Sequence, residues 1–239
     1  MLLQANKRPY IVINGKSSRL VQGLLITSLP SISLPKMRTK AETIDGRDGD
    51  IITELGYSSY DKKIEIGLTY DYDVNEIISF FATSGKIVFS NEPDKYYRFS
   101  LYDKIDFERL LRFKKAKVNI HVQPFKFSDS EAVKTFTEGP FEIFNQGNYF
   151  SRPNIKIRGV GDVDFFINGE KILSIDFGST EKVITIDSEG MNALDQDGKF
   201  YNRYVIGNYD DIRLNAGTNE IALGGDVRSV SFENWSRWL

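Results

Sequence analysis

The sequence predicts a mainly β protein, and three observations carry that prediction. Short apolar runs alternate with turn residues along most of the 239 residues, as expected for strands joined by tight turns. Residues 115–123 alternate strictly, with Ala116, Val118, Ile120 and Val122 facing a core and the residues between them facing water. Only one segment has helical spacing.

The first predicted elements are a hairpin and several strands. Asn14-Gly15 separates the segment 10–13 from a second apolar segment that begins at Leu20. Asn and Gly tolerate the positive φ angles of a two-residue hairpin turn, so these two segments are predicted to pair. Further strands are predicted at residues 51–55, 64–69, 86–89 and 96–101.

A single helix is predicted over about residues 74–84. Four apolar residues occupy positions i, i+3, i+4 and i+7 of one helical face: Val74, Ile77, Ile78 and Phe81. Asp73 is placed to cap the N-terminus, and Gly85 is placed to end the helix. No other segment predicts a substantial helix.

A domain boundary is predicted near residue 130, because residues 124–139 lose the alternating pattern and gather polar turn residues. The predicted domains are residues 1–130 and 131–239. Asn168-Gly169 marks a second tight hairpin, and strands are predicted at residues 141–144, 154–157, 163–167, 171–175, 183–186, 220–223 and 228–232. Short strands at roughly even spacing predict a β-sandwich.

Composition excludes several kinds of chemistry. The chain has no cysteine, which rules out disulfides, thiolate zinc sites and cysteine nucleophiles. Its one histidine, His121, falls on the water-facing side of a predicted strand. The net charge of −2 predicts no general attraction to nucleic acid or to an anionic membrane. No stretch approaches the roughly 20 apolar residues that cross a bilayer.

Three short motifs fail the requirements of the sites that they suggest. Gly159-Val160-Gly161 lacks the third glycine of a dinucleotide loop, and Gly85-Lys86 lacks the earlier glycine of a phosphate loop. Asp195-Gln196-Asp197-Gly198 has Tyr204 where a calcium loop needs a glutamate, so a polar turn is predicted there. The sequence therefore predicts no catalytic residue, no cofactor and no metal site, and the protein is predicted not to be an enzyme.

The stretch Asp45-Gly46-Arg47-Asp48-Gly49-Asp50 places two glycines among four charges and predicts a tight turn between extended segments. The Pro-punctuated run 29–35 precedes it, and Tyr57-Ser58-Ser59-Tyr60 follows it. Two interpretations remain open for Tyr57, Tyr60, Tyr96 and Tyr97: interface anchors if they are exposed, or core packing, which strands favour.

Several segments occur in a recognisable order along most of the chain. They are Leu29-Pro30 to Pro35, Gly46-Arg47-Asp48-Gly49, the helix before Gly85, Asn91-Glu92-Pro93-Asp94-Lys95-Tyr96-Tyr97, Phe141 to Asn148, Ser151-Arg152-Pro153, Ile184 to Glu189, and Asn215 to Ile221. No segment is specific alone, but the ordered set resembles the distal tail protein (Dit) family of siphophages, which forms the hub of the tail tip or baseplate.

This resemblance implies an N-terminal β-sandwich or barrel-like domain with one α-helix and an extended hairpin arm, followed by a C-terminal galectin-like β-sandwich. It implies a structural virion protein, a homohexameric ring that can stack on a second ring. The arm lies between about residues 35 and 60 and reaches the neighbouring subunit. The resulting candidates for the oligomer interface are Asp45, Gly46, Arg47, Asp48, Gly49, Tyr57 and Tyr60.

The partners implied are further copies of the chain, the tail tube protein, the tail-associated tip protein and receptor-binding or baseplate proteins. DNA is implied only as cargo that passes through the ring, and no membrane partner is implied. The protein is expected at the virion tail tip after synthesis in the cytoplasm of the bacterial host.

A carbohydrate-binding module for host cell-surface glycans is the alternative function, because galectin-like sandwiches in other proteins bind sugars. Such sites stack a tryptophan on the sugar, and the chain offers only Trp235 and Trp238. A hydrolase has less support, because nothing selects a catalytic pair from 33 acidic residues.

Overall fold

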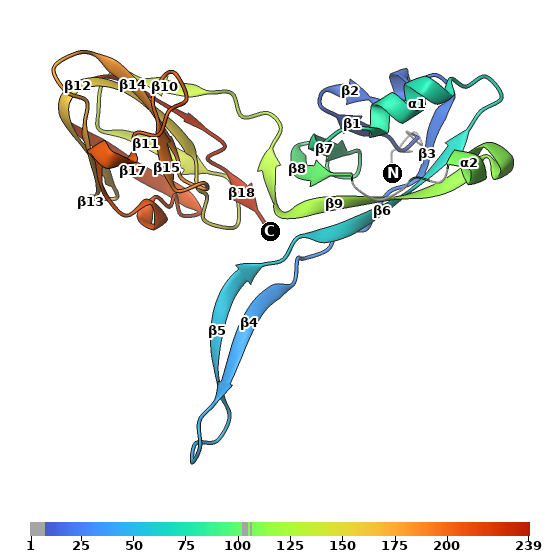
Figure 1. Ribbon diagram of the computed structural model, residues 1–239, viewed down its shortest axis with the longest axis horizontal. Coiled ribbons are helices and arrows are strands. Elements are labelled where there is room, and N and C mark those ends of the chain that lie inside the picture. The colour runs from blue at the N-terminus through green and yellow to red at the C-terminus, as the bar shows by residue number, and fades with distance from the viewer. Residues whose placement is uncertain (1–7, 102–104, 106) are drawn as a thin grey trace, which may run out of the picture. The chain divides into compact units, whose positions relative to one another are not determined.

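The computed structural model describes residues 8–101, 105 and 107–239. Strands dominate, which confirms the mainly β prediction. The chain divides into two compact units: unit 1 holds residues 1–129 with Leu239, and unit 2 holds residues 130–238. Figure 1 labels their elements, and each unit contains its own hydrophobic core.

Unit 1 is built on one antiparallel sheet. Its strands are β1 (Ile11–Ile13), β2 (Lys16–Ser17), β3 (Leu24–Ser28), β6 (Tyr60–Leu68), β7 (Gly85–Phe89), β8 (Lys95–Ser100) and β9 (Lys115–Ser128). They lie in the order β2-β1-β7-β8-β9-β6-β3. The predicted alternation in β9 is confirmed, because Val118, Ile120 and Val122 are at most 1% exposed.

The turn at Asn14-Gly15 forms as predicted, but the strand after it is much shorter than predicted. The two turn residues have φ angles of 47° and 84°. A 3₁₀ helix, η1 (Ser18–Leu20), replaces the predicted apolar return strand after the two residues of β2. The buried Ser18 hydroxyl accepts a hydrogen bond from the Ile11 amide at 3.1 Å, and this contact turns the chain out of the sheet.

The helix α1 (Val74–Phe81) confirms the prediction of a helix in this segment. The Asp73 carboxylate accepts hydrogen bonds from two first-turn amides at 2.8 and 3.2 Å, as an N-cap should. The predicted apolar face is corrected by one position: Ile78 is 38% exposed. The buried face consists of Ile77, Phe80 and Phe81.

The helix is also shorter than the predicted span to about residue 84. Gly85 does not end it but begins β7, with a φ of 137°. The Asn14 side chain accepts a hydrogen bond from the Lys86 amide at 2.9 Å and donates one to the Ser84 carbonyl at 3.0 Å. The Ser84 carbonyl and the Lys86 amide are therefore hydrogen-bonded to Asn14 and are not available to extend the helix.

The prediction of a single helix is wrong, because a second helix, α2 (Phe107–Phe113), precedes β9. Leu110 is 1% exposed in the core, and Leu111 packs against the same core. Seven residues make only two helical turns. So short a segment repeats its apolar spacing too few times to be recognised from periodicity.

The predicted loss of strand pattern at residue 124 is also corrected, because β9 continues to Ser128. Pro124 lies where the pairing of β8 with β9 shifts register, between the Phe99–Val122 and Tyr97–Lys126 pairs. A proline is tolerated at such an irregularity because its missing amide breaks no regular ladder bond.

Unit 2 is a β-sandwich, as predicted, and two long strands run through both of its layers. In one layer, the start of β12 (Asn154–Ile167) pairs with the end of β17 (Gly217–Glu233). On either side of them, β14 (Lys182–Asp187) pairs with β12, and β10 (Lys134–Phe136) pairs with β17. In the other layer, the end of β12 pairs with the start of β17. Here β13 (Glu170–Asp176) pairs with β12, and β11 (Phe141–Asn145) pairs with β17. Three short strands also lie in unit 2: β15 (Asn192–Leu194), which pairs with β14, β16 (Val205–Gly207), which pairs with β13, and β18 (Arg237–Trp238).

Four of the predicted strands are therefore two continuous strands that bend. Residues 154–157 and 163–167 both belong to β12, and residues 220–223 and 228–232 both belong to β17. The bends coincide with register shifts near Gly159 and Gly161, so the Gly159-Val160-Gly161 motif lies in a bulge within a strand. The hairpin at Asn168-Gly169 forms as predicted, with φ angles of 51° and 83°.

We predict that Gly225→Ala destabilises unit 2 by about 3 kcal/mol or more. Gly225 has a φ of 93°, and a Cβ there would lie 2.1 Å from the Asp162 carbonyl oxygen on the facing bend. Gly161→Ala is the matched control: its φ is 68°, but nothing lies within 4 Å of the added Cβ. It should cost only about 1–2 kcal/mol. Urea denaturation measures both, and equal losses would contradict the steric explanation.

Candidate functional site

The most distinctive feature of unit 1 is a two-stranded arm, residues 37–57. Its strands, β4 (Met37–Thr43) and β5 (Asp50–Tyr57), pair only with each other among the strands that the structure describes. Figure 1 shows them as a separate ribbon. Residues 44–49 form the arm tip, where Gly46 and Gly49 have φ angles of 80° and 79°. The arm and its tight turn are confirmed where the sequence predicts them.

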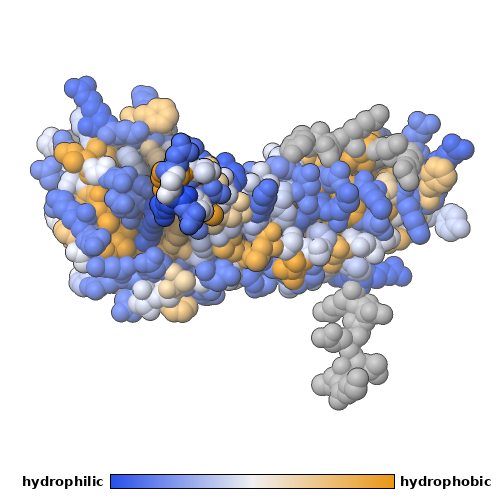
Figure 2. Space-filling model, turned by 90° about the horizontal axis from the view of Figure 1, so that it is seen from below, coloured by the Kyte–Doolittle hydropathy of each residue, from blue (hydrophilic) through white to orange (hydrophobic). Residues whose placement is uncertain are grey.

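The arm has no hydrophobic core of its own. Three of its large apolar residues are exposed: Ile44 at 45%, Ile52 at 65% and Leu55 at 51%. An isolated two-stranded hairpin is marginally stable at best in water. Figure 2 shows a mainly hydrophilic surface with hydrophobic residues in separate patches. No large apolar face is visible in that view.

The arm tip carries two aspartates and one arginine, all exposed. In the described part of the chain, Asp45, Arg47 and Asp48 make no ion pair. The turn itself is closed by the Arg47 amide, which donates to the Ile44 carbonyl at 3.1 Å. The side chains of Asp45 and Asp48 are therefore available to a partner.

The segment that leads into the arm, residues 29–35, is held by side chains from elsewhere in unit 1. Asn91 Nδ2 donates to the Pro30 carbonyl at 3.0 Å, and Lys62 Nζ donates to the Ser31 carbonyl at 3.1 Å. The Tyr60 hydroxyl donates to the Ser33 carbonyl at 3.4 Å. These contacts fix the backbone before β4, and so they fix where the arm begins.

The arm root, which we define as Tyr60, Lys62, Glu92, Tyr97 and Lys126, buries charges under this segment. Lys62 and Lys126 are 3% and 6% exposed. Lys126 Nζ lies 2.9 Å from a Glu92 carboxylate oxygen, and the Tyr97 hydroxyl donates to the other oxygen at 3.2 Å. Lys62 Nζ lies 4.9 Å from the centre of the Tyr97 ring, a cation–π contact.

Burial changes the titration of the arm root. Desolvation lowers the pKa of Lys62, the charge of Glu92 opposes that shift, and the like charge of Lys126 adds to it. Desolvation raises the pKa of the Tyr97 phenol, and burial raises that of Tyr60 in the same direction. Both phenols therefore remain neutral hydrogen-bond donors near neutral pH.

The tyrosines considered as interface anchors all lie near or within the core of unit 1. Tyr96 and Tyr97 are each 1% exposed, so core packing, one of the two interpretations left open by the sequence, is the correct one for both. Tyr57 is half-buried and meets Phe125 edge-on at 5.7 Å between ring centres. Tyr60, also half-buried, belongs to the arm root. Tyr57 and Tyr60 thus make contacts within the same chain at the base of the arm.

Sequence reasoning missed the arm root, although a signal for it exists. In β6, Lys62 falls on the same inward-facing side of the strand as Ile64 and Ile66. In β9, Lys126 falls on the same side of the alternation as the buried Val122. A lysine at an inward position of a strand predicts a buried charge that needs a partner. Only the folded chain places Glu92, from the turn between β7 and β8, beside these lysines.

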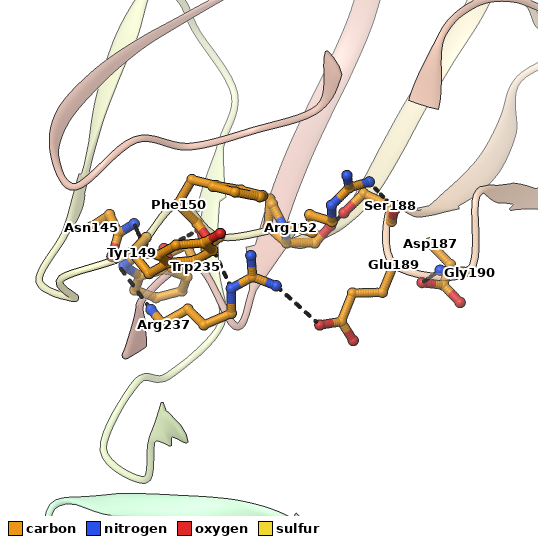
Figure 3. Close-up of polar contacts among 12 residues, drawn as sticks. Asn145, Tyr149, Phe150, Arg152, Asp187, Ser188, Glu189, Gly190, Trp235 and Arg237 are labelled. Carbon is orange, nitrogen blue, oxygen red and sulfur yellow. Dashed lines mark hydrogen bonds and ion pairs between the residues drawn. The ribbon is translucent and has the colours of Figure 1, made fainter. Parts of the chain in front are cut away.

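In unit 2 the candidate sugar-binding tryptophan lies in the core. Trp235 is 4% exposed, and its carbonyl accepts a hydrogen bond from the Ser151 hydroxyl at 2.6 Å. Figure 3 shows Arg237 beside it, with Nε donating to the Phe150 carbonyl at 2.7 Å. Trp235 offers no free ring face to a sugar, and Trp238 is half-buried.

No catalytic or metal centre is evident in the described residues. His121 Nδ1 lies 2.7 Å from Asp61 Oδ1 on the neighbouring strand. Within the same residues no group of three metal-ligating side chains occurs. No helix there is long and apolar enough to cross a membrane. Asp195 accepts hydrogen bonds from the amides of Asp197 and Lys199, each at 2.9 Å, which confirms a polar turn at the calcium-like motif.

We predict that Glu92→Gln destabilises unit 1 by about 3 kcal/mol, because it leaves the buried Lys126 without its counter-charge. Glu65→Gln is the matched control. Glu65 pairs with Lys117 at 3.5 Å on the surface, where both side chains are at least 50% exposed. Its loss should cost less than about 1 kcal/mol. Urea denaturation at pH 7 measures both, and similar losses would show that burial adds nothing to the Glu92 pair.

Comparison with known proteins gives one clear structural likeness. No protein-family model matches the sequence, and no curated protein matches it either. The crystal structure of the Dit protein (gp 19.1) of phage SPP1, described as a paradigm of the hub adsorption apparatus in phages that infect Gram-positive bacteria, matches 98% of this chain and 100% of its own. The TM-score is 0.64 at 16% sequence identity.

A chain of the phage P2 baseplate, in its activated conformation with calcium, matches 94% of this chain and 96% of its own. Its TM-score of 0.44 at 10% identity is too low to define a fold. The fold is therefore defined by the likeness to SPP1 Dit, which spans both units and the arm. The chain has the fold of a Dit hub protein.

Proposed function

We propose that this protein is a structural hub of a phage tail tip, a homohexameric ring that connects the tail tube to the tip or baseplate. The observation that carries the proposal is the likeness to SPP1 Dit over 98% of the chain, because it includes both units in one order. The ordered segments that resemble the Dit family support it independently.

The arm supports self-assembly on physical grounds. It exposes the apolar residues Ile44, Ile52 and Leu55, and its tip forms no ion pair within the described residues. A head-to-tail contact between arm and neighbour repeats around a ring and is satisfied in every copy when the ring closes. The tip residues Asp45, Gly46, Arg47, Asp48 and Gly49 are the proposed contact, with Tyr57 and Tyr60 setting the direction of the arm.

The remaining partners follow from the same role. Residues 1–130 form the ring, and residues 131–239 form a galectin-like sandwich that docks other tail proteins. These are the tail tube protein, the tail-associated tip protein and receptor-binding or baseplate proteins, with DNA passing through the ring as cargo. The protein is made in the host cytoplasm and resides at the virion tail tip. It performs no catalysis in this role.

Sugar binding has less support than the hub role. A stacking site needs an accessible aromatic face, and Trp235 is 4% exposed. A glycan array that detects binding lost in Trp238→Ala would restore this alternative.

The test of the hub role is the solution mass of the full chain by light scattering, with negative-stain images of the same sample. We expect six times the chain mass of 27.3 kDa, or twelve times if two rings stack. A monomer at all concentrations up to the solubility limit would contradict self-assembly into a ring.

We predict that shortening the arm yields a folded monomer. Replacing residues 38–56 with a short Gly-Ser linker keeps β6, the arm root and both cores, so the thermal unfolding of the two units should change little. Light scattering should then report a single chain mass, because the proposed contact is gone. Rings that persist in this variant would show that the arm is dispensable for assembly.

A further inference from the structure

A surface groove of about 280 Å³ lies beside the edge strand β3 in unit 1. It is lined by the apolar residues Pro9, Leu24, Leu25 and Ile26, together with Ser18, Arg8 and Arg19. The outer edge of β3 pairs with no strand that the structure describes. The strand carries no charged residue and no proline, two of the usual protections of a free edge, and its one irregularity is a register shift between Ile26 and Ser28. This face therefore suits contact with another polypeptide.

The two arginines of the groove lack an acidic partner. Neither Arg8 nor Arg19 forms an ion pair within the described residues, and no described residue that lines the groove is acidic. Arg19 is held in place by neutral contacts: one guanidinium nitrogen donates to the Arg8 carbonyl at 2.8 Å, and the guanidinium lies 4.1 Å from the centre of the Tyr10 ring. Its other N–H donors remain available.

The arm tip has the complementary chemistry. Asp45 and Asp48 are unpaired carboxylates, and Ile44 beside them is 45% exposed. Arginine binds carboxylates through two parallel hydrogen bonds, and an adjacent apolar wall accommodates an apolar side chain. Two aspartates beside an isoleucine thus match two arginines beside apolar residues, and the aspartates outnumber the one arginine of the tip, Arg47.

We propose that the arm tip of one copy binds in the Arg8–Arg19 groove of the next copy, with Asp45 and Asp48 on the arginines and Ile44 on the apolar floor. This inference rests on the proposed function, because it names the surface that receives the arm in the ring. The contact is head-to-tail, so each copy gives one tip and offers one groove.

The test reverses charge on each side separately. The tip variant carries Asp45→Arg and Asp48→Arg, and the groove variant carries Arg8→Asp and Arg19→Asp. Each variant alone should place like charges together and weaken assembly by ~100-fold in apparent dissociation constant, measured by light scattering across a dilution series. Arg203→Asp, at an exposed position in unit 2, is the control that should assemble as the unaltered chain does.

Mixing the two variants is the decisive part of the experiment. In an alternating ring, reversed tips meet reversed grooves and unaltered tips meet unaltered grooves, so every contact regains opposite charges. Rings should therefore form in the equimolar mixture although neither variant forms them alone. A variant that had simply misfolded would not be rescued by mixing, and recovery would place the contact between different copies.

Two results would overturn the proposed contact between tip and groove without contradicting the proposed ring. One is that the tip variant alone forms rings as readily as the control. The other is that both variants keep the thermal unfolding of the unaltered chain, fail to assemble alone and fail as a mixture, which would mean that tip and groove do not contact each other. A monomeric unaltered chain would instead contradict the proposed function itself, before either variant is measured.

Discussion

The arm of this protein depends on charges buried beneath its first residues. Lys62 and Lys126 lie at the end of an otherwise apolar core, and their positive charge is compensated by Glu92, by a backbone carbonyl and by aromatic faces. Buried charges tolerate few arrangements, because each lost partner leaves a costly unsatisfied group. The segment 29–35 must therefore sit where Ser31 can accept from Lys62, and that position sets the start of the arm.

Unit 2 meets a different constraint, which is how to join two layers with few strands. The long strands β12 and β17 bend between the layers and contribute to both, so the sandwich is continuous through its core. Glycine makes the bends possible, since at Gly225 the backbones approach so closely that no side chain fits. Aromatic packing then closes one side: Phe136 stacks on Phe141 with ring centres 3.7 Å apart, and both meet Phe232 edge-on.

The buried charges of unit 1 and the bent strands of unit 2 suit a protein whose proposed role is to assemble into a ring. The interior of each unit is closely packed, whereas three surface features have no partner among the described residues of one copy: the arm, the outer edge of β3, and the two arginines of the groove. A head-to-tail ring satisfies such features through repetition of a single contact. The hub role and the groove that receives the arm are thus two levels of one hypothesis, and the groove contact can fail while the hub role stands.

The sequence by itself determined what local chemistry controls. The turns at Asn14-Gly15, Asn168-Gly169 and the arm tip follow from backbone preferences, the Asp73 cap follows from hydrogen bonding to adjacent amides, and β9 follows from alternation. Only the tertiary structure decided that Lys62 and Lys126 share Glu92, that α2 forms, and that the strands of unit 2 are continuous. These features depend on contacts between residues far apart in the chain, whose free energy no local pattern encodes.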